Sequence, residues 1–195
     1  MLTLKQTIRR ESRLLRQSIP DARRAKAAAS LADNLEKMQA LQAGAIVAVY
    51  FANDGEISLD NLIQRATNLG AICVVPVIPE KGNRLLRFAE VGGPVKDNRF
   101  GIPEPNVPPE QLYGIEQLDT VLVPLVAFDD TGNRLGMGGG YYDTTLAEGV
   151  AMRPDTPIKV IGVAHEVQRM EALETEEWDI PLDVIVTDQT IHYFT

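Results

Sequence analysis

The chain has 195 residues, a formal net charge of −8, 45% hydrophobic and 24% charged residues, which is typical of one soluble globular domain. The acidic balance argues against general nucleic-acid or membrane binding, because both of those surfaces are anionic. No apolar run approaches the ~20 residues that span a bilayer, and the N-terminus lacks the pattern of a secretory signal. We therefore expect a cytoplasmic protein with small-molecule partners and no obligate protein partner. The single cysteine, Cys73, cannot form an internal disulfide.

Positive charge is concentrated near the N-terminus, where residues 1–26 contain eight Lys or Arg and two acidic side chains. Helical periodicity predicts helices over residues 3–17 and 21–38, which form an N-terminal helical pair spanning residues 2–38. Three apolar residues of the first helix are expected to face the core: Leu4, Ile8 and Leu15. Four cations line a neighbouring stripe: Lys5, Arg9, Arg13 and Arg16. This stripe is either a solvated helix face or a site for a small anion.

Residues 45–195 alternate between apolar runs and helical patterns, which is typical of an α/β core. Short continuous apolar runs predict buried parallel strands at 46–51, 71–77, 120–127, 158–164 and 184–187. Helices are expected near 58–69, from 140 onward, and over the glutamate-rich residues 166–177. The Gly- and Pro-rich residues 82–110 are expected to form a hairpin or excursion over the sheet edge. The sequence therefore predicts a single domain over residues 1–195, a three-layer α/β/α sandwich with a mostly parallel, Rossmann-like sheet.

One glycine-rich segment stands out for its position. Residues 132–143, Gly-Asn-Arg-Leu-Gly-Met-Gly-Gly-Gly-Tyr-Tyr-Asp, lie between a predicted buried strand and a predicted helix, where open α/β sheets bind ligands. Glycine lets backbone N–H groups approach a phosphate, the helix adds its dipole, and Arg134 can add a charge-assisted contact. The alternative is a mobile surface loop. Four glycines directly after a buried strand favour a phosphate-binding loop: Gly136, Gly138, Gly139 and Gly140.

Neither common phosphate-binding motif describes this segment. A Walker A loop requires Gly-Lys-Ser/Thr, which does not follow these glycines. A dinucleotide fingerprint that begins at Gly136 and Gly138 would place its third glycine where Tyr141 stands. The segment therefore indicates a nucleotide-using enzyme with a different kind of phosphate loop.

Residues 123–143, Val-Pro-Leu-Val-Ala-Phe-Asp-Asp-Thr-Gly-Asn-Arg-Leu-Gly-Met-Gly-Gly-Gly-Tyr-Tyr-Asp, closely resemble the signature of the 5-formyltetrahydrofolate cyclo-ligases, also called methenyltetrahydrofolate synthetases. Further family features match in the same order along nearly the whole chain: Lys-x-x-x-Arg on the first helix at Lys5 and Arg9, an acid after the first strand at Glu56, and an Asp before a Val-Thr-Asp strand at Asp179. Two positions depart from the pattern. Many members have Arg or Lys where Met137 stands and a basic residue where Thr144 stands, which we interpret as variation within the family.

The resemblance implies ATP- and Mg²⁺-dependent cyclisation of 5-formyltetrahydrofolate to 5,10-methenyltetrahydrofolate through phosphorylation of the formyl oxygen, with release of ADP and phosphate. ATP is then a co-substrate and Mg²⁺ the metal. The implied ATP-binding residues are Lys5, Arg9, Arg134, Gly136, Gly138, Gly139, Gly140, Tyr141 and Tyr142. The implied folate-binding residues are Glu56, at the donor edge of the pterin, and Phe51 and Tyr141, against the rings. The implied metal ligands are Asp143 and Asp179.

These residues also have plainer interpretations. Asp143 and Glu56 are acids at predicted helix N-termini, where the dipole favours them without any ligand. Asp179 is then a surface acid, and Phe51 packs in the core. Two other functions stay open for the whole chain. One is a sugar-phosphate isomerase or acyl-CoA transferase relative that needs no ATP, and the other is a folate- or nucleotide-binding regulator without turnover.

Overall fold

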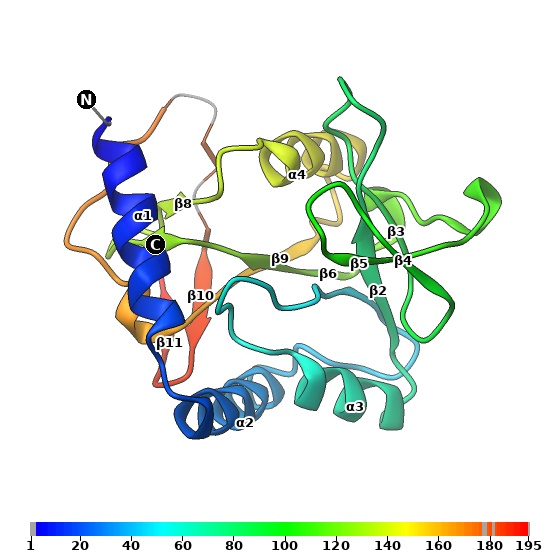
Figure 1. Ribbon diagram of the computed structural model, residues 1–195. Helices are drawn as coiled ribbons and strands as arrows, with labels where there is room; N and C mark the ends of the chain where they lie inside the picture. The colour runs from blue at the N-terminus through cyan, green and yellow to red at the C-terminus, as the bar shows by residue number, and fades with distance from the viewer. Residues whose placement is uncertain (1–2, 177–178, 181, 195) are drawn as a thin grey trace.

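The computed structural model describes residues 3–176, 179–180 and 182–194 (Figure 1). Its helices are α1 (Leu4–Gln17), α2 (Asp21–Lys37), α3 (Asp60–Asn68) and α4 (Tyr141–Met152), with 3-10 turns η1 (Pro109–Gln111), η2 (Ile115–Gln117) and η3 (Glu166–Gln168). Its strands are β1 (Ile46–Ala48), β2 (Ile72–Val77), β3 (Arg87–Glu90), β4 (Val95–Asp97), β5 (Pro103–Pro105), β6 (Thr120–Pro124), β7 (Ala127–Phe128), β8 (Arg134–Leu135), β9 (Lys159–Ala164), β10 (Val184–Thr187) and β11 (Ile191–Tyr193).

The central sheet has seven strands in the order β11-β10-β9-β6-β1-β2-β3. Its five inner strands are parallel to one another, whereas the edge strands β3 and β11 pair antiparallel with β2 and β10. The apolar runs that were expected to be buried parallel strands supply these inner strands. The predicted mostly parallel sheet is therefore confirmed.

Helices cover both faces of the sheet, as the period-2 alternation of buried strand residues requires. Val47 and Leu122 point to one face and pack in a cluster with Leu31 of α2. Val121 points to the other face and packs with Leu146 of α4. Figure 1 shows α2 and α3 together on one side of the sheet and α4 on the other. The three-layer sandwich is confirmed.

The helix expected over residues 166–177 is wrong. Only η3 forms there, and the described residues that follow it, up to 176, are irregular. The backbone of this segment bonds to another part of the chain, because Met170 N donates to Phe128 O at 2.7 Å and Leu173 N donates to Asp129 Oδ2 at 3.0 Å. Helix α1 contacts η3 and also β7, which belongs to the separate two-stranded β7–β8 ribbon (Figure 1).

The core-facing stripe expected on α1 is correct only in part. Ile8 is buried against Ala127 and packs near β8, but Leu4 and Leu15 are 54% and 51% exposed. Arg16, which was expected on the cationic stripe, is fully buried. Two of the three buried residues of α1, Ser12 and Arg16, are polar, so hydrophobicity does not identify its buried side.

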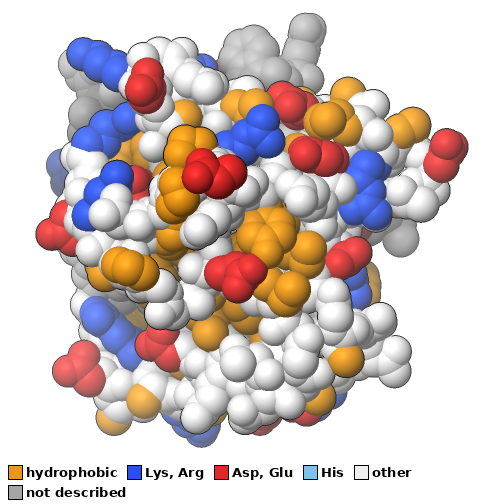
Figure 2. Space-filling model, turned by 90° about the vertical axis from the view of Figure 1, so that its right-hand side faces the viewer, with side chains coloured by type: hydrophobic (Ala, Val, Ile, Leu, Met, Phe, Trp, Pro, Cys, Tyr) orange, Lys and Arg blue, Asp and Glu red, His pale blue; other side chains and the backbone are white. Residues whose placement is uncertain are grey.

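The Gly- and Pro-rich residues 82–110 form the expected excursion at the sheet edge. β3 closes the sheet, and β4 and β5 form a separate two-stranded ribbon. The outer edge of β3 is partly covered, because Phe88 N donates to Tyr113 O at 3.0 Å and Tyr113 N donates to Phe88 O at 2.7 Å. Figure 2 looks at this end of the molecule and shows hydrophobic side chains gathered at the centre of the face, with charged groups around them.

Within the described residues, none of the helices is long and apolar enough to cross a membrane.

Candidate functional site

Two loops leave the sheet between β1 and β6, where the strand order changes direction. β1 and β6 are parallel neighbours, but the chain continues from β1 to β2 on one side and from β6 to β9 on the other. Parallel strands end at the same edge. Residues 49–59 after β1 (the β1 loop) and residues 125–140 after β6 (the β6 loop) therefore leave the sheet side by side. In open α/β sheets this switch point is where ligands bind. It lies between the segments that contain Glu56 and the glycines.

The glycine segment runs from the short β7–β8 ribbon into α4. Gly138 has φ +89° and Gly140, at the N-cap of α4, has φ +70°, a left-handed conformation that favours glycine. Because Gly140 has no side chain, the first amides of α4 receive no side-chain cap. Amides at such a helix start suit an anion. The binding of phosphate by this segment stays a prediction, which its left-handed glycines and uncapped helix start favour.

Helix α1 reaches this segment with its cationic stripe. Arg9 Nε donates to the carbonyl of Gly136 at 2.8 Å, and a Cβ on Gly138 would lie 3.4 Å from the Arg9 guanidinium. Lys5 Nζ lies 3.1 Å from Glu176 Oε1 and 3.7 Å from Asp179 Oδ2. Lys5 and Arg9 thus connect α1 to two of the segments that were expected to form the site.

Arg134 holds the beginning of α4 against the segment before β10. Its Nη2 donates to Asp143 Oδ1, and its Nη1 donates to the carbonyl of Ile180, next to Asp179. The Arg134 side chain is almost fully buried, whereas about a third of Asp143 is exposed. The guanidinium therefore brings both predicted metal ligands to one region of the molecule.

The carboxylates of Asp143 and Asp179 suit a hard cation such as Mg²⁺, which uses one or two protein carboxylates together with substrate phosphates. Both are partly exposed, and both already lie beside a cation, Arg134 or Lys5. Among the described residues, His, Cys, Asp and Glu side chains form no group of three or more that could hold a metal by themselves. The donor set therefore fits a metal shared with phosphate rather than an all-protein cage.

Glu56 lies in the β1 loop, and both its backbone and its side chain form hydrogen bonds with Asn53. Its N donates to Asn53 O at 2.9 Å, and its Oε2 accepts from Asn53 N at 3.1 Å. Burial raises the pKa of Glu56, while the Asn53 amide and the charge of Arg16 oppose that rise. Burial also raises the pKa of Tyr142 strongly, and the Glu56 carboxylate raises it further. Glu56 and the start of α4 are therefore close enough to influence each other electrostatically.

Tyr141 contacts Arg99 and Phe100, two residues that no sequence pattern marked. Arg99 Nη2 donates to Tyr141 Oη at 2.5 Å, and the Arg99 guanidinium lies 5.2 Å from the Phe100 ring centroid. The Phe100 and Tyr141 rings meet edge to face at 6.4 Å, and 54% of Phe100 is exposed. The β4–β5 excursion thus places an exposed aromatic ring and a cation beside the glycine segment. Phe51, by contrast, is half-buried and packs against the core under α2 and α3.

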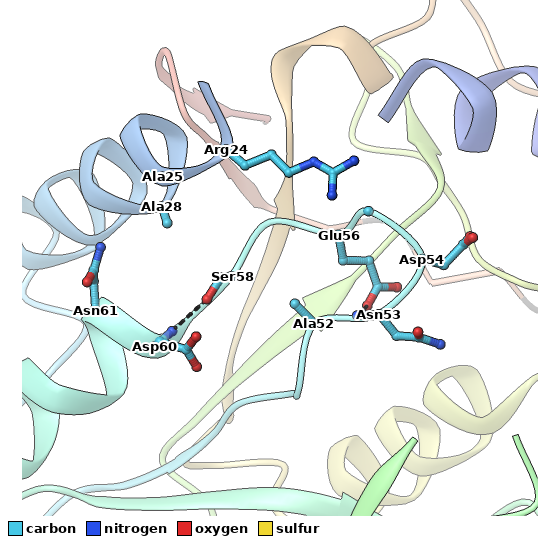
Figure 3. A pocket seen from close by; sticks show the side chains of 11 residues that line it. Arg24, Ala25, Ala28, Ala52, Asn53, Asp54, Glu56, Ser58, Asp60 and Asn61 are labelled. Atoms are coloured by element: carbon cyan, nitrogen blue, oxygen red, sulfur yellow. Dashed lines mark hydrogen bonds between the residues drawn. The ribbon is translucent and has the colours of Figure 1, made fainter. Parts of the chain in front are cut away.

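An open pocket lies on the α2 and α3 side of the β1 loop. It is lined by loop residues 52–56 and 58 and by Arg24, Ala25, Ala28, Asp60 and Asn61, and includes no residue of the glycine segment. Figure 3 shows the Glu56 carboxylate turned toward Asn53 and away from Arg24, which extends from α2 over the loop. Glu56 therefore lines this pocket with its carboxylate turned back toward its own loop.

Asp54 and Arg16 form an ion pair that sequence reasoning missed. Arg16 Nη2 lies 2.8 Å from Asp54 Oδ2, and Arg13 Nε lies 2.5 Å from the same oxygen. The hydrogen bond from Arg13 is the main cause that lowers the pKa of Asp54 to about 2, with Arg16 and Gln17 acting in the same direction against burial. The cationic stripe was the available signal, but nothing in the sequence pairs it with the β1 loop.

The sequence profile of the 5-formyltetrahydrofolate cyclo-ligase family matches residues 2–188. The 5-formyltetrahydrofolate cyclo-ligase of Haemophilus influenzae is 35% identical over 185 residues, covering 93% of this chain and 97% of the relative. The one from Escherichia coli is 37% identical over 147 residues, covering 74% and 79%. Among solved structures, the 5,10-methenyltetrahydrofolate synthetase of Aquifex aeolicus has a TM-score of 0.77 at 27% identity, covering 98% of this chain and 93% of that one. The synthetase of Mycoplasma pneumoniae has a TM-score of 0.74 at 22% identity, covering 95% and 99%, and supports the fold alone.

Proposed function

The chain belongs to the 5-formyltetrahydrofolate cyclo-ligase family of enzymes, and on that premise we propose that it converts 5-formyltetrahydrofolate into 5,10-methenyltetrahydrofolate, using ATP and Mg²⁺ and releasing ADP and phosphate. The names of the relatives support the folate conversion. The requirement for ATP and Mg²⁺, the phosphorylated intermediate and the residue roles are our proposal.

The observation that carries this proposal is the pair of loops at the β1–β6 switch point. The glycine segment presents backbone amides, and the cation Arg9 reaches it from α1, which together suit the phosphates of a nucleotide. The loop after β1 presents the partly buried carboxylate of Glu56, which suits the N–H donors of a pterin ring. A reaction that transfers the γ-phosphoryl group of ATP to a formylated folate needs both subsites at neighbouring positions, and these loops leave neighbouring strands.

The chemical problem is that the formyl group is an amide whose oxygen is a poor leaving group. In the proposed reaction, the formyl oxygen attacks the γ-phosphorus of ATP, the bond to ADP breaks, and an iminium phosphate forms. The neighbouring anilino nitrogen then attacks the formyl carbon. The carbon–oxygen bond breaks, and phosphate departs with the formyl oxygen. The proton that the nitrogen loses is released with the phosphate. Positioning and charge stabilisation dominate such phosphoryl transfers.

The residues around the glycine segment supply that positioning. Arg9 and Lys5 add positive charge from α1, and the amides at the start of α4 bind phosphate oxygens. Arg134 holds Asp143 in place through its ion pair. Asp143 and Asp179 would hold Mg²⁺, whose chemistry is to neutralise phosphate charge.

The residues around Glu56 and Tyr141 orient the folate. Glu56 binds the donor edge of the pterin, and the hydrogen bond from Asn53 N to its Oε2 fixes the direction of its carboxylate. Tyr141, with Phe100 and Arg99 over it, provides an aromatic surface for a flat ring. We keep Phe51 as a candidate ring contact, although its packing against the α2 and α3 core gives it a structural role.

Absorbance of the methenyl product provides the test. Purified protein is incubated with 5-formyltetrahydrofolate, and product is expected only when ATP and Mg²⁺ are both present, with one ADP released for each product formed. Product without ATP, or tight folate binding without product, would overturn the proposal, and the second result would favour a regulator.

A matched pair of arginines on α1 tests the ATP subsite. Arg9→Gln should raise the KM for ATP at least about tenfold, because a charge-assisted contact to phosphate is lost. Arg10→Gln removes the same charge from the adjacent, exposed position and should leave the KM for ATP unchanged. Equal effects of both substitutions would mean that only the general charge of α1 matters.

A further inference from the structure

Arg16 occupies an unusual position for a charged residue of an outer helix. Its side chain is only 1% exposed, yet it contacts both loops of the switch point. Its Nε donates to the Asp54 carbonyl at 2.8 Å, and its Nη2 donates to Asp54 Oδ2 at 2.8 Å. Its Nη1 donates to the carbonyl of Leu125 at 3.4 Å, directly after β6. One buried guanidinium therefore joins the loop after β1 to the loop after β6.

The β1 loop is shaped to accept this contact. Asp54 has φ +52°, which is uncommon for a residue other than glycine, and Gly55 has φ +78°. A Cβ on Gly55 would lie 3.1 Å from Arg16 C and O and 3.1 Å from Gln17 Cα. The loop therefore lies directly against the end of α1, where a side chain at position 55 would be crowded and its backbone strained. The next residue of this tightly held loop is Glu56.

Arg16 also reaches Glu56 itself, because Arg16 Nη1 lies 3.7 Å from Glu56 Oε1. The titratable groups that interact electrostatically with this carboxylate are Arg16 from α1, Asp54 from the same loop, Tyr50 after β1 and Tyr142 from α4. Arg24 of α2 lines the same pocket, but the carboxylate is turned away from it (Figure 3), and Arg16 is the cation that acts on it. Burial disfavours a charged carboxylate, and a nearby positive charge opposes that effect.

We propose that Arg16 is the positioning residue of the folate subsite, which fixes the β1 loop to the β6 loop and holds the Glu56 carboxylate in the orientation that binds the pterin. This inference rests on the proposed function, since it assigns a task to Glu56 in that reaction. Arg16 is not a catalytic residue, because it acts through Glu56.

The alternative is that Arg16 only stabilises the fold. A buried ion pair is a poor source of stability, because apolar side chains of similar volume often stabilise a protein as well or better. The geometry of Arg16 is better explained by orientation, because its guanidinium bonds to two loops and lies beside the one carboxylate that we place in the folate site. A stabilising role and a positioning role predict different kinetics.

The kinetic test uses Arg16→Met, which keeps volume but removes charge, and Arg16→Lys, which keeps charge but loses the planar, multiply bonded group. We expect Arg16→Met to raise the KM for 5-formyltetrahydrofolate at least about tenfold, as loss of a charge-assisted contact implies, with the KM for ATP unchanged. The acidic limb of kcat/KM for the folate should move to higher pH in Arg16→Met and stay in place in Arg16→Lys. Equal changes in both KM values, or an unmoved limb in Arg16→Met, would overturn the proposal.

Arg13→Gln is the matched control, because Arg13 binds Asp54 and no contact joins it to Glu56 among the described residues. It should lower thermal stability without shifting the acidic limb. A limb shift in Arg13→Gln as large as that in Arg16→Met would mean that loss of loop anchoring alone explains the effect.

A double-mutant cycle with Glu56→Gln decides between the two roles even if Arg16→Met does not fold. Arg16→Lys should raise the KM for the folate in the unaltered protein and have little further effect in the Glu56→Gln background. The same fold-change in both backgrounds would refute positioning through Glu56. Activity of the unaltered protein is measured first, so a wrong proposed function appears as absent product, whereas a wrong role for Arg16 appears as independent effects in an active enzyme.

Discussion

Arg9 and Gly136 are 127 positions apart in the sequence, and a hydrogen bond of 2.8 Å joins the Nε of one to the carbonyl of the other. This bond fixes the middle of α1 to the glycine segment. The guanidinium of Arg9 also lies where a side chain on Gly138 would project. The shape of the proposed phosphate subsite therefore depends on a glycine at position 138 as well as on the cation at position 9.

Gly138→Ala should impair ATP binding more than folate binding. At φ +89° a side chain costs about 1–2 kcal/mol of backbone strain, and the added methyl would lie 3.4 Å from the Arg9 guanidinium. We expect the KM for ATP to rise by about tenfold, the effect of roughly 1.4 kcal/mol. Steady-state kinetics with each substrate varied in turn measure this.

Alanine substitutions of two other glycines serve as controls for Gly138→Ala. Gly136→Ala should have a smaller effect, because Gly136 does not have a positive φ and a Cβ there would meet nothing within 4 Å. Gly93→Ala, in the turn before β4 and equally free of neighbours, should leave both KM values unchanged. If Gly136→Ala proves as harmful as Gly138→Ala, the left-handed backbone is not the reason that position 138 requires glycine.

Much of the fold could be predicted from the sequence, because each inner strand is a short apolar run and each run is buried on both faces. The helix at 166–177 could not be excluded in this way. Its composition suits a helix, but Phe128 and Asp129 accept hydrogen bonds from backbone amides of Met170 and Leu173. Those partners lie about forty residues earlier, so no local pattern reveals them.

The candidate site, like the fold, could be predicted from the sequence only in part. The glycines and their position after a strand could be predicted, because sheet topology places that junction at a ligand-binding edge. Arg16 could not be separated from the exposed cations of its stripe, because its burial depends on how closely Gly55 approaches α1. Phe100 could not be identified either, since the Gly- and Pro-rich excursion has no periodicity that indicates where its side chains point.

Asp143→Asn should reduce turnover sharply, by about a hundredfold or more if one metal-binding carboxylate is lost. The substitution keeps the shape of the side chain and removes the charge that pairs with Arg134 and that we propose holds Mg²⁺. The concentration of Mg²⁺ needed for half-maximal rate should rise as well. Glu148→Gln removes one negative charge from the same helix and should change neither quantity. An unaltered Mg²⁺ dependence in Asp143→Asn would remove Asp143 from the metal site.

Phe100→Ala should weaken folate binding and leave ATP binding intact. Phe100 is half-exposed and meets Tyr141 edge to face, so its ring is available to a flat ligand. An aromatic contact of this kind contributes about 0.5–1.5 kcal/mol, so we expect the KM for 5-formyltetrahydrofolate to rise by about two- to tenfold. Val95→Ala truncates another exposed hydrophobic residue of the same ribbon and should have no such effect. A rise in the KM for ATP alone would place Phe100 at the nucleotide instead.

The ion pairs of Asp54 should make stability depend on pH in the acidic range. The pKa of Asp54 in the folded protein is about 2, below its ordinary value of 3.8, mainly because of the hydrogen bond from Arg13. The unfolded chain therefore takes up this proton more readily, so the stabilisation is fully present above about pH 4 and is lost as pH falls from about 4 towards 2. Urea unfolding midpoints at pH 6, 4, 3 and 2.5 measure the loss.

Asp54→Asn isolates the contribution of this residue to acid unfolding. The variant should be less stable than the unaltered protein at pH 6, and the difference should narrow as pH falls towards 2, because protonated Asp54 has also lost its charge. Asp97→Asn, at an exposed position of β4, should follow the unaltered protein at every pH. A difference for Asp54→Asn that stays constant from pH 6 to pH 2.5 would mean that the shape of the side chain, rather than its charge beside Arg13 and Arg16, holds the loop against α1.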